Sequence, residues 1–402
     1  MKTPVIGRRR FLFGSGVLAA LGVAGGVTTI SWEQLTAAAA DRPHVAGNGI
    51  VVIVTLYGGN DGINTLIPYA DNAYHDARPE LAYAPGDVLH LDDTLGLNPA
   101  LKGLHGQWQG GSLAVIRGVG YPQPDHSHFR SMDIWQTASP SSPVGTGWIG
   151  RWLDATGDDP LRAVNVGPVL PMLGMGARTT AAALNTSGAP LTSSALAHLT
   201  ALAQPDPTDS GPARQVCGSY AAEHTVSDGL REVRSTSHVA AHRGGQSLAD
   251  QLDVVGRCVK YGVPTRVYSV SLSGFDTHAD ERDTQERLLG QLDSALTHFL
   301  TDMAGDPHGR DVIVMAYSEF GRRVRANASE GTDHGTAGPV FVAGAPVKGG
   351  FYGDEPSLTD LDDGDLKATT DFRDIYAELI ASGIGSDPVP AVGPGRRPIG
   401  FL

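Results

Sequence analysis

The segment Gly49-Ile50-Val51-Val52-Ile53-Val54-Thr55-Leu56-Tyr57, followed directly by Gly58-Gly59-Asn60-Asp61-Gly62, decides the fold class of this chain. Its unbroken run of apolar and β-branched residues is typical of a strand that is buried on both faces, as strands are in parallel sheets. The glycines, Asn60 and Asp61 that follow predict a turn at the carboxyl end of this strand.

Similar apolar runs recur along the chain, each separated from the next by enough residues for a helix. They are Leu113–Val119, Arg266–Leu272, Val312–Ala316 and Val340–Val342. Leucines at 3.6-residue spacing predict a helix over 279–303, with Glu281, Arg282, Asp283 and Glu286 facing solvent. This alternation predicts an α/β fold with a large, mostly parallel central sheet, helices on both faces, and ligand-binding loops at the carboxyl ends of the strands.

The N-terminal region has the pattern of an export signal. Gly7-Arg8-Arg9-Arg10-Phe11-Leu12 is a twin-arginine motif, an apolar stretch follows it, and Ala37–Ala40 offers a small-residue cleavage site. We expect residues 1–40 to engage the twin-arginine translocase and to be removed, which places the protein outside the cytoplasm, in the periplasm, at the cell surface or secreted. The alternative is an uncleaved membrane anchor, and no later segment is predicted to span a bilayer.

Composition narrows the function classes. Removing residues 1–40 takes away four basic residues and one acidic residue, so the net charge moves from −13 to about −16, which argues against a nucleic-acid partner. Cys217 and Cys258 are too few for a disulfide scaffold or a cysteine-built zinc site, although one bridge between them is chemically possible. We expect residues 41–402 to form a single domain with an insertion at about 178–245, where Ala, Ser, Thr, Gly and Pro dominate.

Several catalytic signatures are absent from the sequence: the G-x-S-x-G elbow, H-E-x-x-H, the P-loop and C-x-x-C-H. Gly58, Gly59 and Gly62 also lack the G-x-G-x-x-G spacing, which argues against a dinucleotide site.

Acidic and histidine residues follow the predicted strands instead. They fall in five groups: Asp61, Asp125-His126-Ser127-His128, Asp276-Thr277-His278, Glu319 and Asp333-His334. The carboxyl ends of parallel strands lie at one edge of a sheet, so these groups would converge. Carboxylate and imidazole without thiolate suit zinc, manganese or iron, and a higher share of carboxylate suits calcium or magnesium.

Two of these groups also have explanations that need no metal. Asn60-Asp61-Gly62 is a common turn sequence. Thr277 and Asp280 have the spacing of a capping box for the helix over 279–303, which leaves only Asp276 and His278 unexplained.

The other groups have alternatives as well. His126 and His128 suit a surface loop, and Glu319 could form a solvated salt bridge with Arg322 or Arg323. The joint position of all groups at strand ends favours the metal site.

Six ordered motifs together resemble a bacterial secreted family called domain of unknown function 1501. The motifs are Leu56–Thr65, His126–Gln136, Gly145–Arg151, Gly274–His278, Ser318–Arg322 and Gly331–Gly335. The resemblance extends to Asp371–Tyr376, and the family is distantly similar to the alkaline phosphatase and sulfatase superfamily.

That distant similarity implies an alkaline phosphatase-like α/β sandwich with metals at the strand ends. It would make Asp61 the first-strand metal carboxylate, Asp276 and His278 the mid-chain pair, Glu319 the late-strand acid and His334 the last histidine. The chain departs from the pattern in three ways: Asp276 and His278 are closer together than the corresponding pair, Glu319 replaces an Asp-His pair, and there is no sulfatase-type C-x-P-x-R motif. Ser127 is the best candidate nucleophile, because a helix that begins nearby would direct free N–H groups at a phosphate or sulfate, and Ser131 is a weaker one.

The leading hypothesis is therefore an exported metal-dependent hydrolase of a phosphate or sulfate ester, with a small-molecule or glycan-linked anionic ester as substrate. Zinc, calcium, manganese and magnesium are the candidate ions, and the metal-ligand candidates are Asp61, His126, His128, Asp276, His278, Glu319, Asp333 and His334. Arg130 or Arg322 could hold the non-bridging ester oxygens. The alternatives are a non-catalytic periplasmic or cell-surface protein that binds a glycan or a partner, and a hydrolase that uses water directly.

Overall fold

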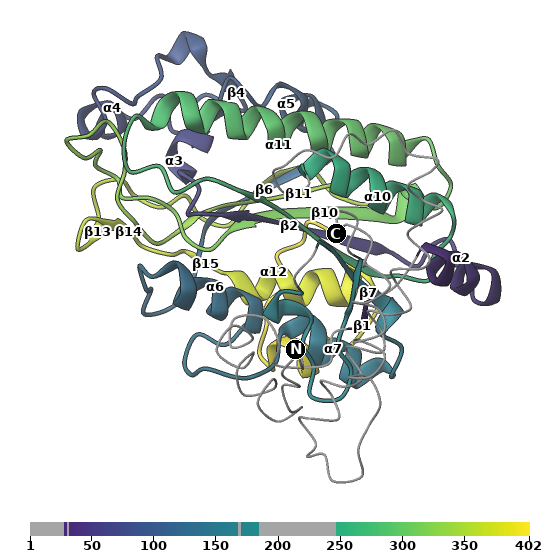
Figure 1. Ribbon diagram of the computed structural model, residues 1–402. Coiled ribbons are helices and arrows are strands. Elements are labelled where there is room, and N and C mark those ends of the chain that lie inside the picture. The colour runs from purple at the N-terminus through teal and green to yellow at the C-terminus, as the bar shows by residue number, and fades with distance from the viewer. Residues whose placement is uncertain (1–27, 30–31, 168–169, 185–246) are drawn as a thin grey trace, which may run out of the picture.

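A ten-stranded sheet forms the centre of the computed structural model, which describes residues 28, 29, 32–167, 170–184 and 247–402 (Figure 1). Nine of its strands follow the spatial order β1-β8-β7-β9-β2-β10-β11-β6-β12, and β15 pairs with β6. Their bounds are β1 Thr28–Thr29, β2 Ile50–Tyr57, β6 Leu113–Gly120, β7 Ala163–Val166, β8 Ala182–Leu184, β9 Val267–Ser273, β10 Val312–Ser318, β11 Gly338–Ala343, β12 Gly350–Tyr352 and β15 Thr370–Asp371. Two small sheets, β3-β5-β4 (Leu66–Ile67, Gly96–Leu97, Leu89–His90) and β13-β14 (Leu361–Asp362, Asp365–Leu366), lie beside it.

The mostly parallel sheet confirms the predicted fold class. In the middle, β2 runs parallel to both β9 and β10, with Val52 beside Tyr268 on one side and Val314 on the other. The five predicted strands correspond to β2, β6, β9, β10 and β11. Only β11 runs antiparallel to its neighbours β10 and β6, so the carboxyl ends of β6, β9, β2 and β10 share one edge.

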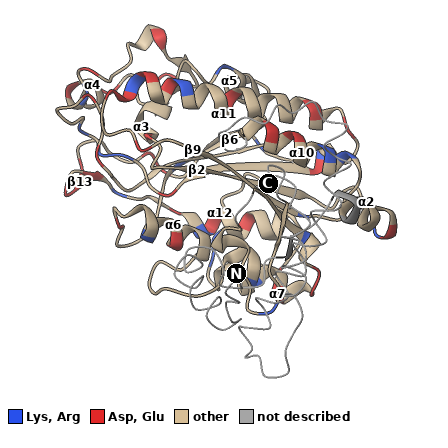
Figure 2. Ribbon diagram, viewed as in Figure 1, with Lys and Arg blue, Asp and Glu red and all other residues tan. Residues whose placement is uncertain are grey.

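Helices cover both faces of the sheet, with α5, α10 and α11 on one face and α6, α7 and α12 on the other (Figure 1). Their bounds are α2 Trp32–Asp41, α3 Gly62–Thr65, α4 Asn72–Ala77, α5 Lys102–Gln109, α6 His128–Thr137, α7 Trp148–Thr156, α10 Leu248–Lys260, α11 Glu281–Ala304, α12 Phe372–Glu378 and α13 Val389–Val392. Figure 2 shows the charged residues spread over these outer helices, while β2 and β9 are free of charge.

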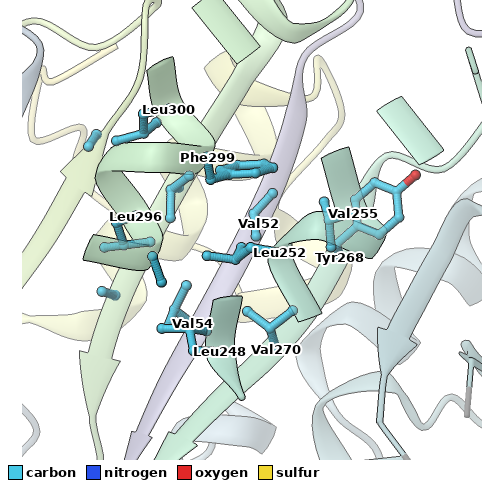
Figure 3. Close-up of a cluster of buried hydrophobic side chains, with 14 of the residues drawn as sticks. Val52, Val54, Leu248, Leu252, Val255, Tyr268, Val270, Leu296, Phe299 and Leu300 are labelled. Carbon is cyan, nitrogen blue, oxygen red and sulfur yellow. The ribbon is translucent and has the colours of Figure 1, made fainter. Parts of the chain in front are cut away.

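Two hydrophobic cores explain why β2 is apolar throughout. Val52 and Val54 point to one face and pack with side chains of α10 and α11, among them Leu252 and Phe299 (Figure 3). Val51 and Ile53 point to the other face, in the core that includes side chains of α7 and α12. Since successive residues of a strand face opposite sides, burial on both sides removes the usual apolar-polar alternation.

The helix predicted over 279–303 is α11, but its first turn differs from expectation in two respects. Glu281, expected to face solvent, is fully buried, because its N–H donates to the Glu330 carbonyl and its side chain accepts from Thr332. The predicted capping box does not form either. The N-cap residue is Asp280, in a left-handed conformation without a side-chain cap bond, and Thr277 donates to the Phe275 carbonyl.

Part of the predicted leader is packed against the fold. In α2, Leu35 is fully buried and Ala39 is nearly so, and β1 pairs with β8. The twin-arginine motif, most of the predicted insertion and Cys217 lie outside the described residues. Cys258 is a buried thiol, and burial raises its pKa to about 12. Within the described ranges no helix has both the length and the apolar character needed to cross a membrane.

Candidate metal centre

Chain segments that follow three strands meet at the shared carboxyl edge of the sheet. His128 is the first residue of α6, which follows β6; Asp276 and His278 follow β9; Glu319 and His334 lie between β10 and β11. One ligand-type atom from each of His128, Asp276 and His334 lies within 4.8 Å of the other two. These residues are up to 206 positions apart in the chain, and the sheet brings them together.

Three imidazole rings turn the same nitrogen, Nε2, towards one carboxylate oxygen. The Oδ1 atom of Asp276 is 3.0 Å from Nε2 of His278, 3.2 Å from Nε2 of His334 and 3.4 Å from Nε2 of His128. The Nε2 atom of His128 is buried and has no hydrogen-bond partner among the described residues. An orphaned buried nitrogen of this kind is costly unless something binds it.

The other nitrogen of each ring, Nδ1, is held from behind by an oxygen. Nδ1 of His128 is 2.9 Å from Oε1 of Glu319, and Nδ1 of His334 is 2.7 Å from the His126 carbonyl oxygen. Nδ1 of His278 is 3.5 Å from Oδ1 of Asp333. A carbonyl or carboxylate oxygen accepts the Nδ1 proton, so in the neutral ring the Nε2 lone pair faces Asp276, as it does in metal-binding histidines.

His278 and His334 bring two basic nitrogens together. Their Nε2 atoms are 3.0 Å apart, and the rings are tilted by 43°. Two lone pairs at this distance repel each other unless a proton or a cation lies between them. This arrangement is therefore suited to a positively charged ligand.

Neighbouring charges tune the acid and the bases of the cluster. Partial burial alone would raise the pKa of Asp276, but the hydrogen bond from Arg322 and the contact with the His334 ring outweigh it and lower this pKa to about 2. The hydrogen bond to Glu319 raises the pKa of His128, while burial lowers the pKa of His334. Asp276 thus stays ionised across the physiological pH range.

Glu319 lies behind His128 and is only 1% exposed. Its Oε1 atom also accepts from the Gly58 N–H at 2.9 Å, and its Oε2 atom accepts from the Ser318 hydroxyl at 2.9 Å. Burial alone would raise its pKa, but the His128 ring and backbone N–H groups lower it. Glu319 therefore positions His128, in place of the solvated salt bridge that was the alternative.

Arg322 joins three loops beneath the cluster, and its side chain is fully buried. It donates to the carbonyl oxygens of Gly58, Gly59, Phe275 and Thr332 and, at 2.9 Å, to Oδ1 of Asp276. These bonds occupy its donors, so Arg322 holds the loops and the charge of Asp276 from behind.

Gly58 and Gly59 let these loops approach one another. Both have positive φ angles, 116° and 69°. A Cβ atom on Gly58 would lie 2.5 Å from the Asp276 nitrogen, and one on Gly59 would lie 2.2 Å from the Phe320 ring. No other residue fits either position, so these two glycines serve the close packing of the site.

Asp61 lies in a separate buried network. Its Oδ2 atom accepts from Arg78 Nη1 at 2.5 Å, both side chains are fully buried, and its carboxyl group interacts with that of Glu281. Burial and the Asp61 charge raise the pKa of Glu281 well above its usual range. The sequence analysis missed Arg78 and Glu281. The burial of Glu281 could have been predicted, because positions 281, 285, 288 and 292 recur at helical spacing on the buried side of α11.

The remaining predicted residues lie at the edge of the candidate metal centre. His126 pairs with Asp365 at 2.7 Å and contributes its carbonyl oxygen to His334, so it diverges from His128. Ser127 is exposed, is the N-cap residue of α6, and makes no side-chain cap bond. Arg130 pairs with Asp133 at 2.5 Å.

Comparisons with solved structures found similarities at low sequence identity. The structure is similar to a protein in the alkaline phosphatase superfamily from Vibrio parahaemolyticus (TM-score 0.43, 10% identity, covering 87% of this chain and 70% of that one). It is also similar to the lipoteichoic acid synthase LtaP from Listeria monocytogenes (TM-score 0.38, 9% identity, covering 93% and 81%). No curated protein matched the sequence. A family model described as protein of unknown function (DUF1501) matches residues 120–388, two thirds of the chain, and the chain therefore belongs to this family.

Proposed function

We propose that this protein is an exported, metal-dependent hydrolase of a phosphate or sulfate ester. The observation that carries the proposal is the orientation of three imidazoles, all with Nε2 towards Asp276. In His128 and His334 an oxygen also holds Nδ1 by a hydrogen bond. Rings that serve only as surface side chains need no such support on one nitrogen and convergence on the other.

The donor set suits a particular class of ion. Two or three imidazole nitrogens and one carboxylate fit zinc, manganese or iron better than calcium or magnesium, which prefer oxygen ligands. The buried, unpartnered Nε2 of His128 and the close Nε2 atoms of His278 and His334 fit a cation. His128, Asp276 and His334 would hold it, with His278 as an additional ligand.

The chain would supply the rest of the chemistry. When bound, a divalent ion supplies Lewis-acid stabilisation of negative charge on the ester oxygens. Asp276 stays ionised at neutral pH because Arg322 donates to it, and Glu319 keeps His128 oriented. The first N–H groups of α6, beside Ser127, would attract the anionic ester, and the exposed Ser127 hydroxyl would be the nucleophile.

Metal content and turnover test the proposal together. We expect close to one zinc, manganese or iron ion per chain and hydrolysis of an aryl phosphate or aryl sulfate. His334→Gln should lose both metal and turnover, because it removes a ligand. His298→Gln is the matched control, since His298 is exposed on α11 and away from the site. Less than about 0.1 metal per chain after reconstitution with each ion would refute the proposal, because metal chemistry requires near-stoichiometric occupancy.

A second variant identifies the nucleophile. If Ser127 attacks the ester, Ser127→Ala should abolish turnover while metal content stays unchanged. If water attacks directly, Ser127→Ala retains turnover and His334→Gln does not. Stoichiometric metal without turnover of either ester would contradict the hydrolase and favour a binding protein.

A further inference from the structure

A large cleft of about 1000 Å³ opens at the carboxyl ends of β7, β9 and β2. It is bounded on the other sides by the first turn of α10 and by one stripe of α11. The stripe consists of Arg287, Gly290, Gln291, Ser294 and Ala295, which recur at the helical spacing. The volume is at the upper end of the range for ligand sites.

The cleft adjoins the candidate metal centre through shared chain segments. Tyr57 and Ser273 line it, and each is the last residue of its strand. The next residues are Gly58, whose N–H donates to Glu319, and Gly274, whose N–H donates to the Tyr57 carbonyl at 3.2 Å. A ligand in the cleft would therefore lie against the same loops that carry Asp276 and support His128.

The lining is rich in hydroxyl and amide groups and poor in charge. Its polar members are Thr55, Tyr57, Asn165, Ser247, Gln251, Ser269, Ser271, Ser273, Gln291 and Ser294. Several of them already form internal hydrogen bonds, among them Thr55, Asn165 and Gln251, whereas Ser273, Gln291 and Ser294 are exposed. Among the described lining residues Arg287 alone is charged, and Val270 and Leu272 face the opposite side of β9 from its serines. Exposed neutral donors and acceptors near apolar surface complement a sugar ring, which has hydroxyl groups at its rim and C–H groups on its faces.

Gly290 lies on the side of α11 that lines the cleft and has no side chain to fill it. Glycine inside a helix costs about 1 kcal/mol relative to alanine. A Cβ atom at Gly290 would meet no atom within 4 Å, so packing does not require glycine there. The effect of its missing side chain is to leave space in the cleft.

We propose that this cleft binds an uncharged oligosaccharide, which forms the non-reacting part of the ester substrate. This inference rests on the proposed function for its link to the reaction, but saccharide binding itself requires neither metal nor turnover.

Ligand-detected NMR on the intact, metal-loaded protein tests the inference with three probes: cellotriose, maltotriose and chitotriose. We expect saturation transfer to at least one of them. Gly290→Trp should weaken its binding by at least about tenfold, a loss of 1.4 kcal/mol, because the indole fills the cleft. Gly106→Trp on α5 is the matched control, since a Cβ atom there also meets nothing within 4 Å and α5 is away from the cleft.

Gln291→Ala provides a variant without added bulk and should weaken binding by removing one amide, with the melting temperature checked for each protein. Absence of transfer to all three saccharides would overturn the inference, as would equal binding by Gly290→Trp and Gly106→Trp. Turnover of the small aryl ester by wild-type protein is measured separately, so loss of the hydrolase proposal and loss of the saccharide site give different results.

Discussion

Substitution of Glu319 by glutamine tests whether a buried carboxylate tunes the candidate metal ligand His128. Glutamine has the same shape, so its Oε1 atom can still accept from His128 Nδ1 and from the Gly58 N–H. The substitution removes the negative charge behind the ring and the Oε2 acceptor of the Ser318 hydroxyl, which can still donate to the Leu56 carbonyl. We therefore expect the fold to persist and the metal affinity to fall.

The magnitude follows from the change in one hydrogen bond. A bond to a charged acceptor contributes about 1 to 2 kcal/mol more than a bond to a neutral one. At 1.4 kcal/mol for each factor of ten, the zinc Kd should rise about 5- to 30-fold. This range overlaps the loss of about 10- to 100-fold that is usual when the hydrogen-bond partner of a metal-binding histidine is removed.

Competition between the protein and a chromophoric chelator for zinc measures this change. At pH 8, Glu319→Gln should bind zinc more weakly than wild type, and Glu80→Gln, an exposed acid far from the cluster, should bind equally. The difference in zinc Kd between wild type and Glu319→Gln should become smaller at acidic pH. Glu319 raises the pKa of His128, so the wild type must displace a more tightly held proton from that ring before the metal binds.

An unchanged zinc Kd for Glu319→Gln at pH 8, together with weakened binding by His334→Gln, would refute this reasoning. It would mean that Glu319 holds loops together without tuning His128.

Three further predictions concern stability. Asp61→Asn should lower the free energy of unfolding by about 3 to 5 kcal/mol in urea titrations, because it leaves the fully buried Arg78 charge without its partner; a loss below about 1 kcal/mol would contradict the buried pair. Glu281→Gln should make the free energy of unfolding less dependent on pH above about pH 4. The wild-type Glu281 carboxyl group has a raised pKa in the folded state, so its contribution to this free energy is complete below the unfolded pKa and is lost as pH rises. The same pH dependence of the free energy of unfolding in wild type and Glu281→Gln would exclude a raised pKa for Glu281. Leu35→Ala in the full chain should cost about 2 to 5 kcal/mol, because α2 packs this side chain into the core, and N-terminal sequencing of exported protein shows whether α2 is retained. Equal melting temperatures for wild type and Leu35→Ala would rule out that packing.

The sequence by itself determined five of the ten strands of the central sheet and the positions of the ligand-type residues relative to them. The apolar run at 50–57 requires burial on both faces, and this requirement implies a parallel sheet with its loops gathered at one edge. Because β-strand geometry is local, the predicted convergence of His128, Asp276 and His334 needed only the order of the strands.

Only the tertiary structure decided what each side chain does at that edge. Asp61 follows β2 as expected, but it pairs with Arg78 and Glu281, and Glu281 is buried although it lies in an otherwise charged helical turn. Whether a carboxylate faces a metal, an arginine or another acid depends on partners that only the fold brings together, such as Arg78, 17 positions from Asp61, and Glu281, 220 positions from it. No local pattern encodes those contacts. Glu319 and Arg322 lie three residues apart, but their tertiary contacts differ. Glu319 supports His128, while Arg322 secures the loops beneath Asp276.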